Sequence, residues 1–315
     1  MADLPKYALL DGAIVPWENA TVHVASAAFK FGTTVFEGIR AYWNEDDRDF
    51  YLFRMQDHMA RLDFSQRFMR FEDAYSADHV TAKTLELIHA NGFKGTSLHI
   101  MTSCYVAGMG GQGVCGPVGL AITALERPRT QNVLNGVTVQ VSSWIRVPDN
   151  AMPMRVKCNA NYNNGRLATV QAQADGYQTA LMLNSRGKVS EGPGMCFFMV
   201  RDGRVITPAP SNDTLESITR DTVIRLIEGE FGMTVVERDV DRSELHAAEE
   251  AFFCGTAWEV TPIPEIDRIK VGTGTIGPLT KRLQQLYFDV TVGATPKYAE
   301  WRMPVYGSAE AKAAE

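Results

Sequence analysis

Met154-Arg-Val-Lys-Cys-Asn-Ala-Asn-Tyr162 stands where an apolar strand is expected to end and a helix to begin. The lysine in the middle of this segment, Lys157, carries an amine of the kind that reacts with carbonyl compounds. Most lysines are solvated surface residues, so Lys157 alone is weak evidence for a reactive site. The interpretation of this segment therefore depends on what accompanies it elsewhere in the chain.

Two further segments offer groups for ligand binding. Glu191 lies in Val189-Ser-Glu-Gly-Pro-Gly194, where glycines and a proline hold its carboxylate at a strand-to-turn junction. Thr214-Leu-Glu-Ser-Ile-Thr-Arg-Asp221 precedes a predicted amphipathic helix, with Ser217 or Thr219 as the expected N-cap. The exposed N–H groups of such a first turn form an anion site. Each segment taken alone is more often a plain turn or a simple capped helix.

A fourth segment completes the pattern. Cys254-Gly-Thr-Ala-Trp-Glu-Val-Thr-Pro262 is typical of a strand that breaks into a Gly-Thr turn with free backbone N–H groups. Together the segments supply a lysine for a Schiff base, a carboxylate for a pyridinium nitrogen, a tyrosine (Tyr162) for a phenolate oxygen and a helix N-terminus for a phosphate. These are the requirements of pyridoxal phosphate chemistry.

The rest of the chain predicts an α+β fold in two domains. Its 315 residues exceed one domain of ordinary size. The polar residues 126–132 form the expected linker between a small N-terminal α/β domain (residues 1–125) and a large C-terminal cofactor-binding domain (residues 133–315). Strands, helices and hairpins follow one another in mixed order, which argues against a doubly wound parallel sheet. The expected helices cover residues 54–69, 77–91, 161–175 and 219–231, and the main expected strands cover residues 97–106, 118–125, 137–143, 234–240 and 251–254.

Composition excludes several classes of protein. The net charge is −6, and no block of Lys and Arg is present, so a nucleic-acid-binding protein is not expected. No stretch approaches the about 18 apolar residues of a membrane span, and the N-terminus has no signal-peptide pattern. The 5 cysteines are widely spaced and are expected to be buried free thiols, and no motif predicts a metal site. We expect a cytoplasmic protein.

A glycine run offers a rival function. Gly108, Gly110 and Gly113 fit the dinucleotide-binding spacing of a nicotinamide dehydrogenase. That motif should open a helix, but Pro117 and two more glycines follow it within six residues, so a mobile loop is the better interpretation. A non-catalytic binding protein on the same scaffold would not need Lys157 together with a matching tyrosine and carboxylate.

At this point the sequence resembles a known family, the fold-type IV pyridoxal phosphate aminotransferases, and most closely the branched-chain amino acid aminotransferases. The resemblance covers residues 7–292. It rests on the following ordered motifs: Phe31-Gly-Thr-Thr-Val-Phe-Glu-Gly-Ile-Arg40, His58-Met-Ala-Arg-Leu62, Lys157 with Asn161-Tyr162, Val189-Ser-Glu-Gly-Pro-Gly194, Ile218-Thr-Arg-Asp221, Gly255-Thr-Ala257, Glu259-Val-Thr-Pro262 and Gly277-Pro-Leu-Thr-Lys281.

The resemblance implies a two-domain architecture like that of D-amino acid aminotransferase, and it assigns roles to residues. Lys157 would hold pyridoxal 5′-phosphate as a Schiff base and then move the proton between substrate and cofactor. Glu191 would pair with the pyridine nitrogen and Tyr162 would bond the ring oxygen. The residues that would form the phosphate site are Arg61, Ser217, Ile218, Thr219 and Thr256.

The resemblance also implies a substrate pocket and a homodimer or larger homo-oligomer. The pocket residues would be Phe31, Phe36, Gly38, Arg40, His99, Met109, Thr256 and Ala257. A loop of the Gly108 to Gly113 type, which contains Met109, reaches into the neighbouring subunit's site in this family. The small-molecule partners would be an amino donor and a keto acid acceptor.

Seven residues at four places in the chain depart from the branched-chain enzymes. The family's Tyr-x-Arg, which helps to fix the substrate carboxylate, is His99-Ile-Met101 here, and its pocket tyrosine is Phe31. The family's Glu-Asn is Met195-Cys196, and its Pro-Gly is Glu216-Ser217. We expect a transfer from a hydrophobic, branched-chain-like L-amino acid to 2-oxoglutarate or another keto acid. The alternative is an amine transaminase, R-selective or bifunctional, with a lyase or D-amino acid enzyme further behind. Whether His99 contacts substrate or merely packs stays open.

Overall fold

The computed structural model describes residues 4–307, which form two compact units. Unit 1 contains the chain up to Pro128, the short segment Val156–Ala160 and the chain from Asp289 onward. Unit 2 contains Arg129–Arg155 and Asn161–Phe288. The first boundary falls within the expected linker. The rest differs from the sequence-based division, which placed all residues after 133 in one domain.

Unit 1 is built on a seven-stranded antiparallel sheet in the order β16-β4-β3-β5-β6-β1-β2. Its strands are β1 (Tyr7–Leu10), β2 (Ala13–Pro16), β3 (Thr34–Asn44), β4 (Asp49–Phe53), β5 (Leu98–Val106), β6 (Val118–Glu126) and β16 (Arg302–Pro304). The first hairpin turns at Asp11 and Gly12, which both have positive φ (49° and 86°). This is the conformation that an Asp-Gly turn favours.

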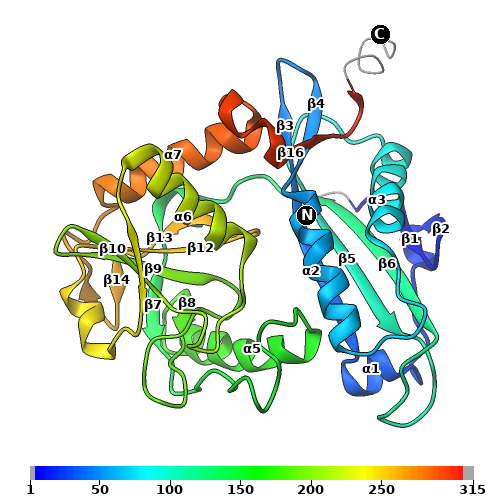
Figure 1. The fold of residues 1–315 in the computed structure, drawn as a ribbon, viewed down its shortest axis with the longest axis horizontal. Helices are drawn as coiled ribbons and strands as arrows, with labels where there is room; N and C mark the ends of the chain where they lie inside the picture. Colours follow the sequence, from blue (N-terminus) through cyan, green and yellow to red (C-terminus); the bar gives the residue numbers. More distant parts are fainter. Residues whose placement is uncertain (1–3, 308–315) are drawn as a thin grey trace. The chain divides into compact units, whose positions relative to one another are not determined.

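Two helices cover this sheet, α2 (Met55–Phe68) and α3 (Ala77–Asn91) (Figure 1). Both match helices predicted from periodicity. Ser76 caps α3 by accepting a hydrogen bond from the N–H of His79, and Gly92 ends it in the left-handed conformation. Leu62 of α2, Leu87 of α3 and Ile100 of β5 are all buried in the same hydrophobic core. Shorter elements of the unit are η1 (Trp17–Asn19), α1 (Ala27–Phe31) and η3 (Pro296–Trp301).

Sheet edges explain why two later segments join unit 1. Of the residues of β3, only Ala41–Asn44 pair with β4, so the first half of β3 is left open on that side. The 156–160 segment fills this edge, because Cys158 forms a β-bridge with Val35 and the N–H of Phe36 donates to the carbonyl of Lys157. β16 in turn pairs with β4 and closes the outer edge. Such long-range pairing leaves no local trace in the sequence.

Unit 2 contains a five-stranded sheet (β11-β10-β9-β12-β13) and a four-stranded sheet (β15-β14-β7-β8). Their strands are β7 (Thr138–Val141), β8 (Thr179–Leu181), β9 (Cys196–Arg201), β10 (Arg204–Pro208), β11 (Val235–Arg238), β12 (Glu250–Gly255), β13 (Glu259–Pro262), β14 (Glu265–Ile266) and β15 (Ile269–Lys270). Phe197 and Phe253 lie in the core of this unit. The helices are α4 (Gln131–Asn135), α5 (Asn159–Ala174), α6 (Ile218–Phe231), η2 (Arg242–Ala247) and α7 (Pro278–Val292), of which α5 and α7 each cross between the two units.

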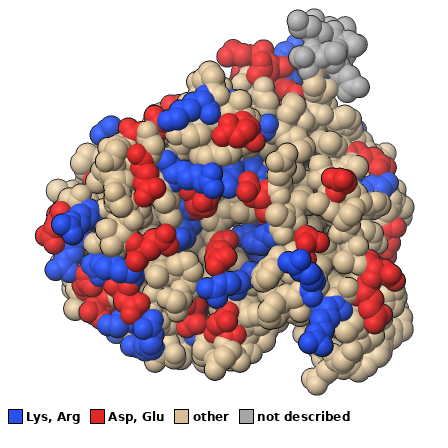
Figure 2. Space-filling view, viewed as in Figure 1, with Lys and Arg blue, Asp and Glu red and all other residues tan. Residues whose placement is uncertain are grey.

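The mixed order of strands and helices confirms the α+β fold class. The expected helix over residues 219–231 is α6, which packs on β12. The strand expected before Lys157 is absent, since Cys158 makes only an isolated bridge there. Of the helices in residues 4–307, none combines the length and apolar character needed to cross a bilayer. Figure 2 shows Lys and Arg interspersed with Asp and Glu on the face in view.

Candidate active site

Lys157 is held by its backbone at the start of β3 in unit 1. Its N–H lies 3.4 Å from Oγ of Ser65 on α2, and its carbonyl accepts a 3.0 Å hydrogen bond from Phe36. The Lys157 ammonium lies 4.5 Å from the centre of the Phe36 ring. The structure therefore brings together the predicted reactive lysine and a predicted pocket residue.

The register of β3 with β5 places four predicted pocket residues on one face of the sheet. Arg40 pairs with His99, and Gly38 pairs with Met101, so these side chains share the face of Phe36. A Cβ atom at position 38 would lie 3.2 Å from Nε2 of His99. Glycine at position 38 therefore lets the imidazole lie directly over the strand.

This face is electropositive. Arg40 is only 2% exposed and donates from NH2 to the carbonyl of Arg127 at 2.5 Å. Its Nε has no hydrogen-bond partner, and no carboxylate of the described chain pairs with it. Burial lowers the pKa of His99 to about 4, helped by Arg127, Arg40, Lys157 and His58. His99 is therefore a neutral imidazole among cations at neutral pH.

Phe31 and Met109 lie together elsewhere in unit 1, on α1 and the glycine-rich loop. Lys30 of α1 donates to the carbonyls of Met109 and Gly110, and its ammonium lies 5.1 Å from the centre of the Phe31 ring. The Phe31 and Met109 side chains are 40% and 59% exposed. No helix follows the glycine run before β6, which confirms that the run is not a dinucleotide-binding motif.

A buried cluster behind β3 was missed by the sequence analysis. Glu37, on the opposite face from Phe36, accepts 2.7 Å contacts from Nε and NH2 of Arg61 and from Nδ1 of His58. Burial opposes ionisation of Glu37, but Arg61 and His58 outweigh it and lower its pKa to about 2. Burial also lowers the pKa of His58. The only sign of this cluster in the sequence is the acidic residue Glu37 within the otherwise largely apolar start of β3.

This cluster changes the expected role of Arg61. The bidentate edge of its guanidinium, assigned to the cofactor phosphate by the resemblance, is already taken by Glu37. If Arg61 bound a phosphate through the same two nitrogens, its buried ion pair with Glu37 would be broken. Arg61 would therefore act on a phosphate mainly by its charge.

Glu191 in unit 2 also has an arginine partner that the sequence did not reveal. Its Oε1 accepts a 2.6 Å hydrogen bond from NH2 of Arg146, and both side chains are almost fully buried. Its Oε2 accepts longer contacts from the N–H of Leu215 (3.3 Å) and the thiol of Cys196 (3.7 Å). Cys196, which replaces the family's Asn, therefore lies against the predicted cofactor carboxylate.

The other predicted cofactor residues gather around this pair. Gly194 lies against both Tyr162 and Gly255, because a Cβ at position 194 would meet the Tyr162 ring at 3.5 Å and one at position 255 would meet the Gly194 carbonyl at 3.4 Å. Leu215, which bonds Glu191, precedes the N-cap of α6 by two residues. Unit 2 thus brings together Glu191, Tyr162, the α6 N-terminus and the turn that follows β12.

Two sets of backbone N–H groups are available for anions in unit 2. Ser217 caps α6 by accepting from the N–H of Arg220, which leaves the N–H groups of Ile218 and Thr219 without an acceptor among residues 4–307. The N–H groups of Thr256 and Ala257 likewise have no acceptor in the described chain. A buried carboxylate beside a helix N-terminus fits the pyridine nitrogen and the phosphate of pyridoxal phosphate.

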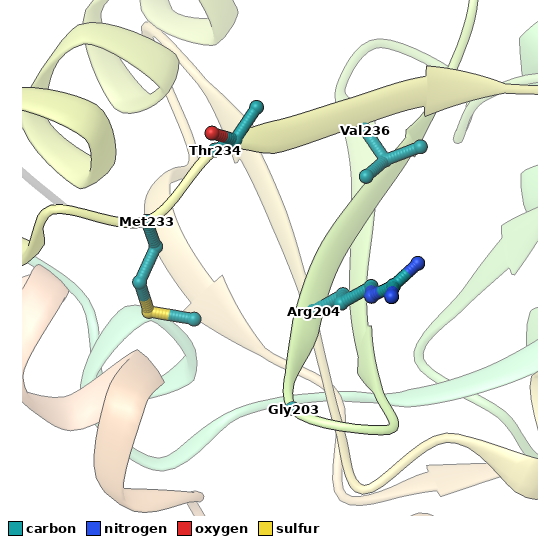
Figure 3. A pocket seen from close by; sticks show the side chains of 5 residues that line it. All are labelled: Gly203, Arg204, Met233, Thr234 and Val236. Atoms are coloured by element: carbon teal, nitrogen blue, oxygen red, sulfur yellow. The ribbon is translucent and has the colours of Figure 1, made fainter.

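A surface concavity that the structure shows in unit 2 is not lined by the predicted site residues. This concavity of about 340 Å³ lies between β10, β11 and the end of α6, where Gly203, Arg204, Met233, Thr234 and Val236 line it (Figure 3). None of these is a predicted site residue. Within the described residues, no group of three or more His, Cys, Asp or Glu side chains is placed to hold a metal ion.

Comparisons with known proteins address the family directly. The family model of the class IV amino-transferases matches residues 34–266. The probable branched-chain-amino-acid aminotransferase of Aquifex aeolicus is 38% identical over 95% of this chain and 97% of its own length. The branched-chain-amino-acid aminotransferase of Escherichia coli K12 is 36% identical over 94% of this chain and 96% of its own length.

Solved structures agree. The branched-chain aminotransferase of Thermoproteus uzoniensis, solved with norvaline, has a TM-score of 0.90 and 40% identity, and the match covers 96% of this chain and all of that one. That of Thermobaculum terrenum, solved in its PLP form, has a TM-score of 0.89 and 41% identity over 96% and 99% of the two chains. The chain therefore belongs to the fold-type IV (class IV) aminotransferases and is a pyridoxal-phosphate-dependent aminotransferase.

Proposed function

We propose that this aminotransferase moves the amino group of a hydrophobic, branched-chain-like L-amino acid to 2-oxoglutarate or another keto acid. The observation that carries the proposal is the buried guanidinium of Arg40, which has no carboxylate partner in the described chain. A buried cation without an acid favours an anionic ligand. An amino acid supplies that anion through its carboxylate, and a simple amine does not. The branched-chain names of the relatives support the same substrate class.

The proposed roles on the cofactor side follow from the contacts in each unit. Pyridoxal phosphate, when bound, supplies the electron sink that makes the substrate α-proton labile. Lys157 would hold the cofactor, and its amine would carry the proton that leaves the substrate α-carbon. Glu191 would accept the N–H of the pyridine ring, and Tyr162 would bond the ring oxygen. The N–H groups of Ile218 and Thr219, with Thr256 and the charge of Arg61, hold the phosphate.

On the substrate side, each group has a separate task. Phe36 offers an apolar surface to the donor side chain, and Gly38 leaves room for the His99 imidazole above the strand. Arg40 binds a substrate carboxylate, and the N–H groups of Thr256 and Ala257 add hydrogen bonds to it. His99 is neutral, so it contributes a polar contact and no charge.

We further propose a homodimer or larger homo-oligomer. Phe29, Phe31, Val24 and Met109 are all more than one-third exposed in unit 1, around α1 and the glycine-rich loop. The Ala27 N–H donates to Gly108, which ties these two segments together. Contiguous apolar side chains of this kind favour contact with another protein surface. A second copy of this chain is the occupant that the family resemblance predicts, and light scattering measures it directly.

A half-reaction experiment tests the substrate class. L-leucine and (R)-1-phenylethylamine are added separately to the purified holoenzyme, and the loss of the visible band of the lysine-bound cofactor is followed. We expect leucine to bleach the band and the amine to leave it. In Arg40→Met, the leucine rate should fall about 10- to 100-fold, since a charged hydrogen bond contributes about 1.5–3 kcal/mol. An unchanged leucine rate in that variant would remove the main support for the proposal.

A second candidate function, an amine transaminase, is favoured by one departure from the family. Met101 stands where the branched-chain enzymes carry an arginine, and it has no charge for a carboxylate. If the amine bleaches the band faster than leucine, this alternative is correct. The double change Met101→Arg with His99→Tyr should then raise leucine activity relative to amine activity. The single change His99→Tyr serves as its control.

A further inference from the structure

We propose that Arg146 is a positioning residue that keeps Glu191 ionised and oriented for the cofactor, whether or not the cofactor is bound. The inference rests on the proposed function, since it takes Glu191 as the partner of the pyridine nitrogen. Arg146 itself matches none of the motifs through which the chain resembles its family. It acts through Glu191 and is not assigned a contact with substrate.

The geometry ties Arg146 and Glu191 to one short segment of backbone. The N–H of Arg146 donates to the carbonyl of Leu183 at 2.7 Å, and the N–H of Met182 donates to the carbonyl of Glu191 at 3.0 Å. Ser190 adds a 2.9 Å bond to Met182. Because adjacent residues anchor both backbones, the 2.6 Å bond between the side chains joins two fixed points.

The three contacts of the Glu191 carboxylate define its orientation. Arg146 holds Oε1 strongly, while Leu215 and Cys196 meet Oε2 at longer distances. Oε1 therefore accepts from the charged donor, and the Leu215 N–H and the Cys196 thiol approach Oε2 from another side. A ligand N–H approaching Oε2 would meet a carboxylate whose plane is already set, which reduces the entropy lost on binding.

Burial indicates that this pair does more than stabilise the fold. The Arg146 side chain is 4% exposed, and its Nε and NH1 have no hydrogen-bond partner within residues 4–307. A buried cation with unsatisfied donors is costly, and apolar residues of similar volume often replace such pairs without loss of stability. The positive charge has a clear electrostatic effect, because it favours the ionised form of the carboxylate beside it.

The test uses the purified holoenzyme and its cofactor-free form, with the dissociation constant of pyridoxal 5′-phosphate measured between pH 5.5 and 8.5. The variants are Arg146→Met, Arg146→Lys, Glu191→Gln and the double variant Arg146→Met with Glu191→Gln. Arg238→Met, which breaks the pair with Glu244 elsewhere in unit 2, is the matched control. Thermal melting of each variant reports whether it folds.

In Arg146→Met, we expect affinity at least tenfold weaker than wild type at pH 6, with recovery toward pH 8.5 as Glu191 loses its proton. Arg146→Lys should restore most of the affinity. The double variant should bind no more weakly than Glu191→Gln alone, because Arg146 acts only through Glu191. The visible spectrum of the bound cofactor should change with pH in Arg146→Met and not in Arg238→Met.

The results separate this inference from the proposed function. If Glu191→Gln binds and reacts like wild type, the proposed role of Glu191 fails, and the inference fails with it. If Glu191→Gln is impaired while Arg146→Met matches wild type at every pH, the inference alone is overturned. Losses that multiply in the double variant would also overturn it, since they would show that Arg146 acts independently of Glu191.

Discussion

Each unit buries a carboxylate against an arginine, but the two arrangements differ. Glu37 in unit 1 has both oxygens engaged by the fork of Arg61, and His58 adds a third short contact. Glu191 in unit 2 accepts a 2.6 Å hydrogen bond from NH2 of Arg146 at Oε1, and longer contacts reach Oε2. The difference teaches that the acceptor capacity of Glu37 is used inside the protein. Glu191 is held instead by donors from three separate segments, Arg146, Cys196 and Leu215.

The largest effect should come from Glu191→Gln. A neutral amide cannot hold the pyridine proton, so kcat should fall about 10²- to 10⁴-fold, the range of a lost acid–base partner. The loss should be the same for every amino donor, because the ring nitrogen is common to all of them. Steady-state kinetics with leucine and with a second donor measure it. Glu244→Gln, another arginine-bound acid of unit 2, is the control. If kcat fell equally in Glu191→Gln and Glu244→Gln, Glu191 would have no special role in the reaction.

Glu37→Gln should instead act mainly on stability. It leaves the buried Arg61 without its partner, and breaking a buried ion pair in this way costs about 3–5 kcal/mol. Chemical denaturation measures the free energy of unfolding. Glu86→Gln, which breaks the exposed Lys83–Glu86 pair on α3, should cost less than about 1 kcal/mol. If both variants lose the same small amount of unfolding free energy, the contacts of Glu37 do not stabilise the protein as expected.

Acid should weaken the molecule through unit 1. The pKa of Glu37 is about 2, below the ordinary 4.5, so its contribution to stability is complete above pH 4.5 and declines as the pH falls toward 2. The pKa of His99 is about 4, below the ordinary 6.5. Between pH 6.5 and 4, His99 is therefore protonated in the unfolded state but not in the folded state. In His99→Gln, the loss of unfolding free energy between pH 6.5 and 4 should shrink by about 1 kcal/mol or more. An unaltered pH dependence would contradict this expectation.

The smallest effect compares two serine caps. Ser76 caps α3 in unit 1 and Ser217 caps α6 in unit 2, each accepting an N–H at 3.3 Å. Replacing either by Ala should cost about 1 kcal/mol of stability, as for other N-caps. Only Ser217→Ala should also weaken cofactor binding, because α6 is the proposed phosphate site. Cofactor affinity that is unchanged in both variants would remove Ser217 from that site.

Local signals predicted the helices α2, α3, α5 and α6 and the strands β5, β6, β7, β11 and β12. Periodicity placed α2, α3 and α6 within a residue or two, and the Asp202-Gly203 turn lies where β9 meets β10. α7, which covers Pro278–Val292, went unpredicted because Gly277-Pro-Leu-Thr-Lys281 was considered only as a family motif. The prediction of a strand before Lys157 was wrong, because that segment forms only an isolated bridge to β3.

For the candidate site, the sequence supplied the residue types and the structure supplied the partners. Lys157, Glu191, Tyr162 and the start of α6 were all named from their segments, and their roles stay predictions. Nothing in the sequence around Arg146 signals a partner, because Glu191 lies 45 positions further along the chain. The same holds for the fork between Arg61 and Glu37, which the motif pattern had assigned to a phosphate.

The sequence by itself determined where α2, α3 and α6 start and stop, and that a lysine, a carboxylate, a tyrosine and a helix N-terminus occur in one chain. Caps, periodicity and turn residues act over a few positions, so they can be recognised locally. Only the tertiary structure decided that residues 156–160 complete the edge of β3 and which arginine faces which acid. Edge pairing and buried charge pairs join distant segments, and their energies exist only once the chain has brought those segments together.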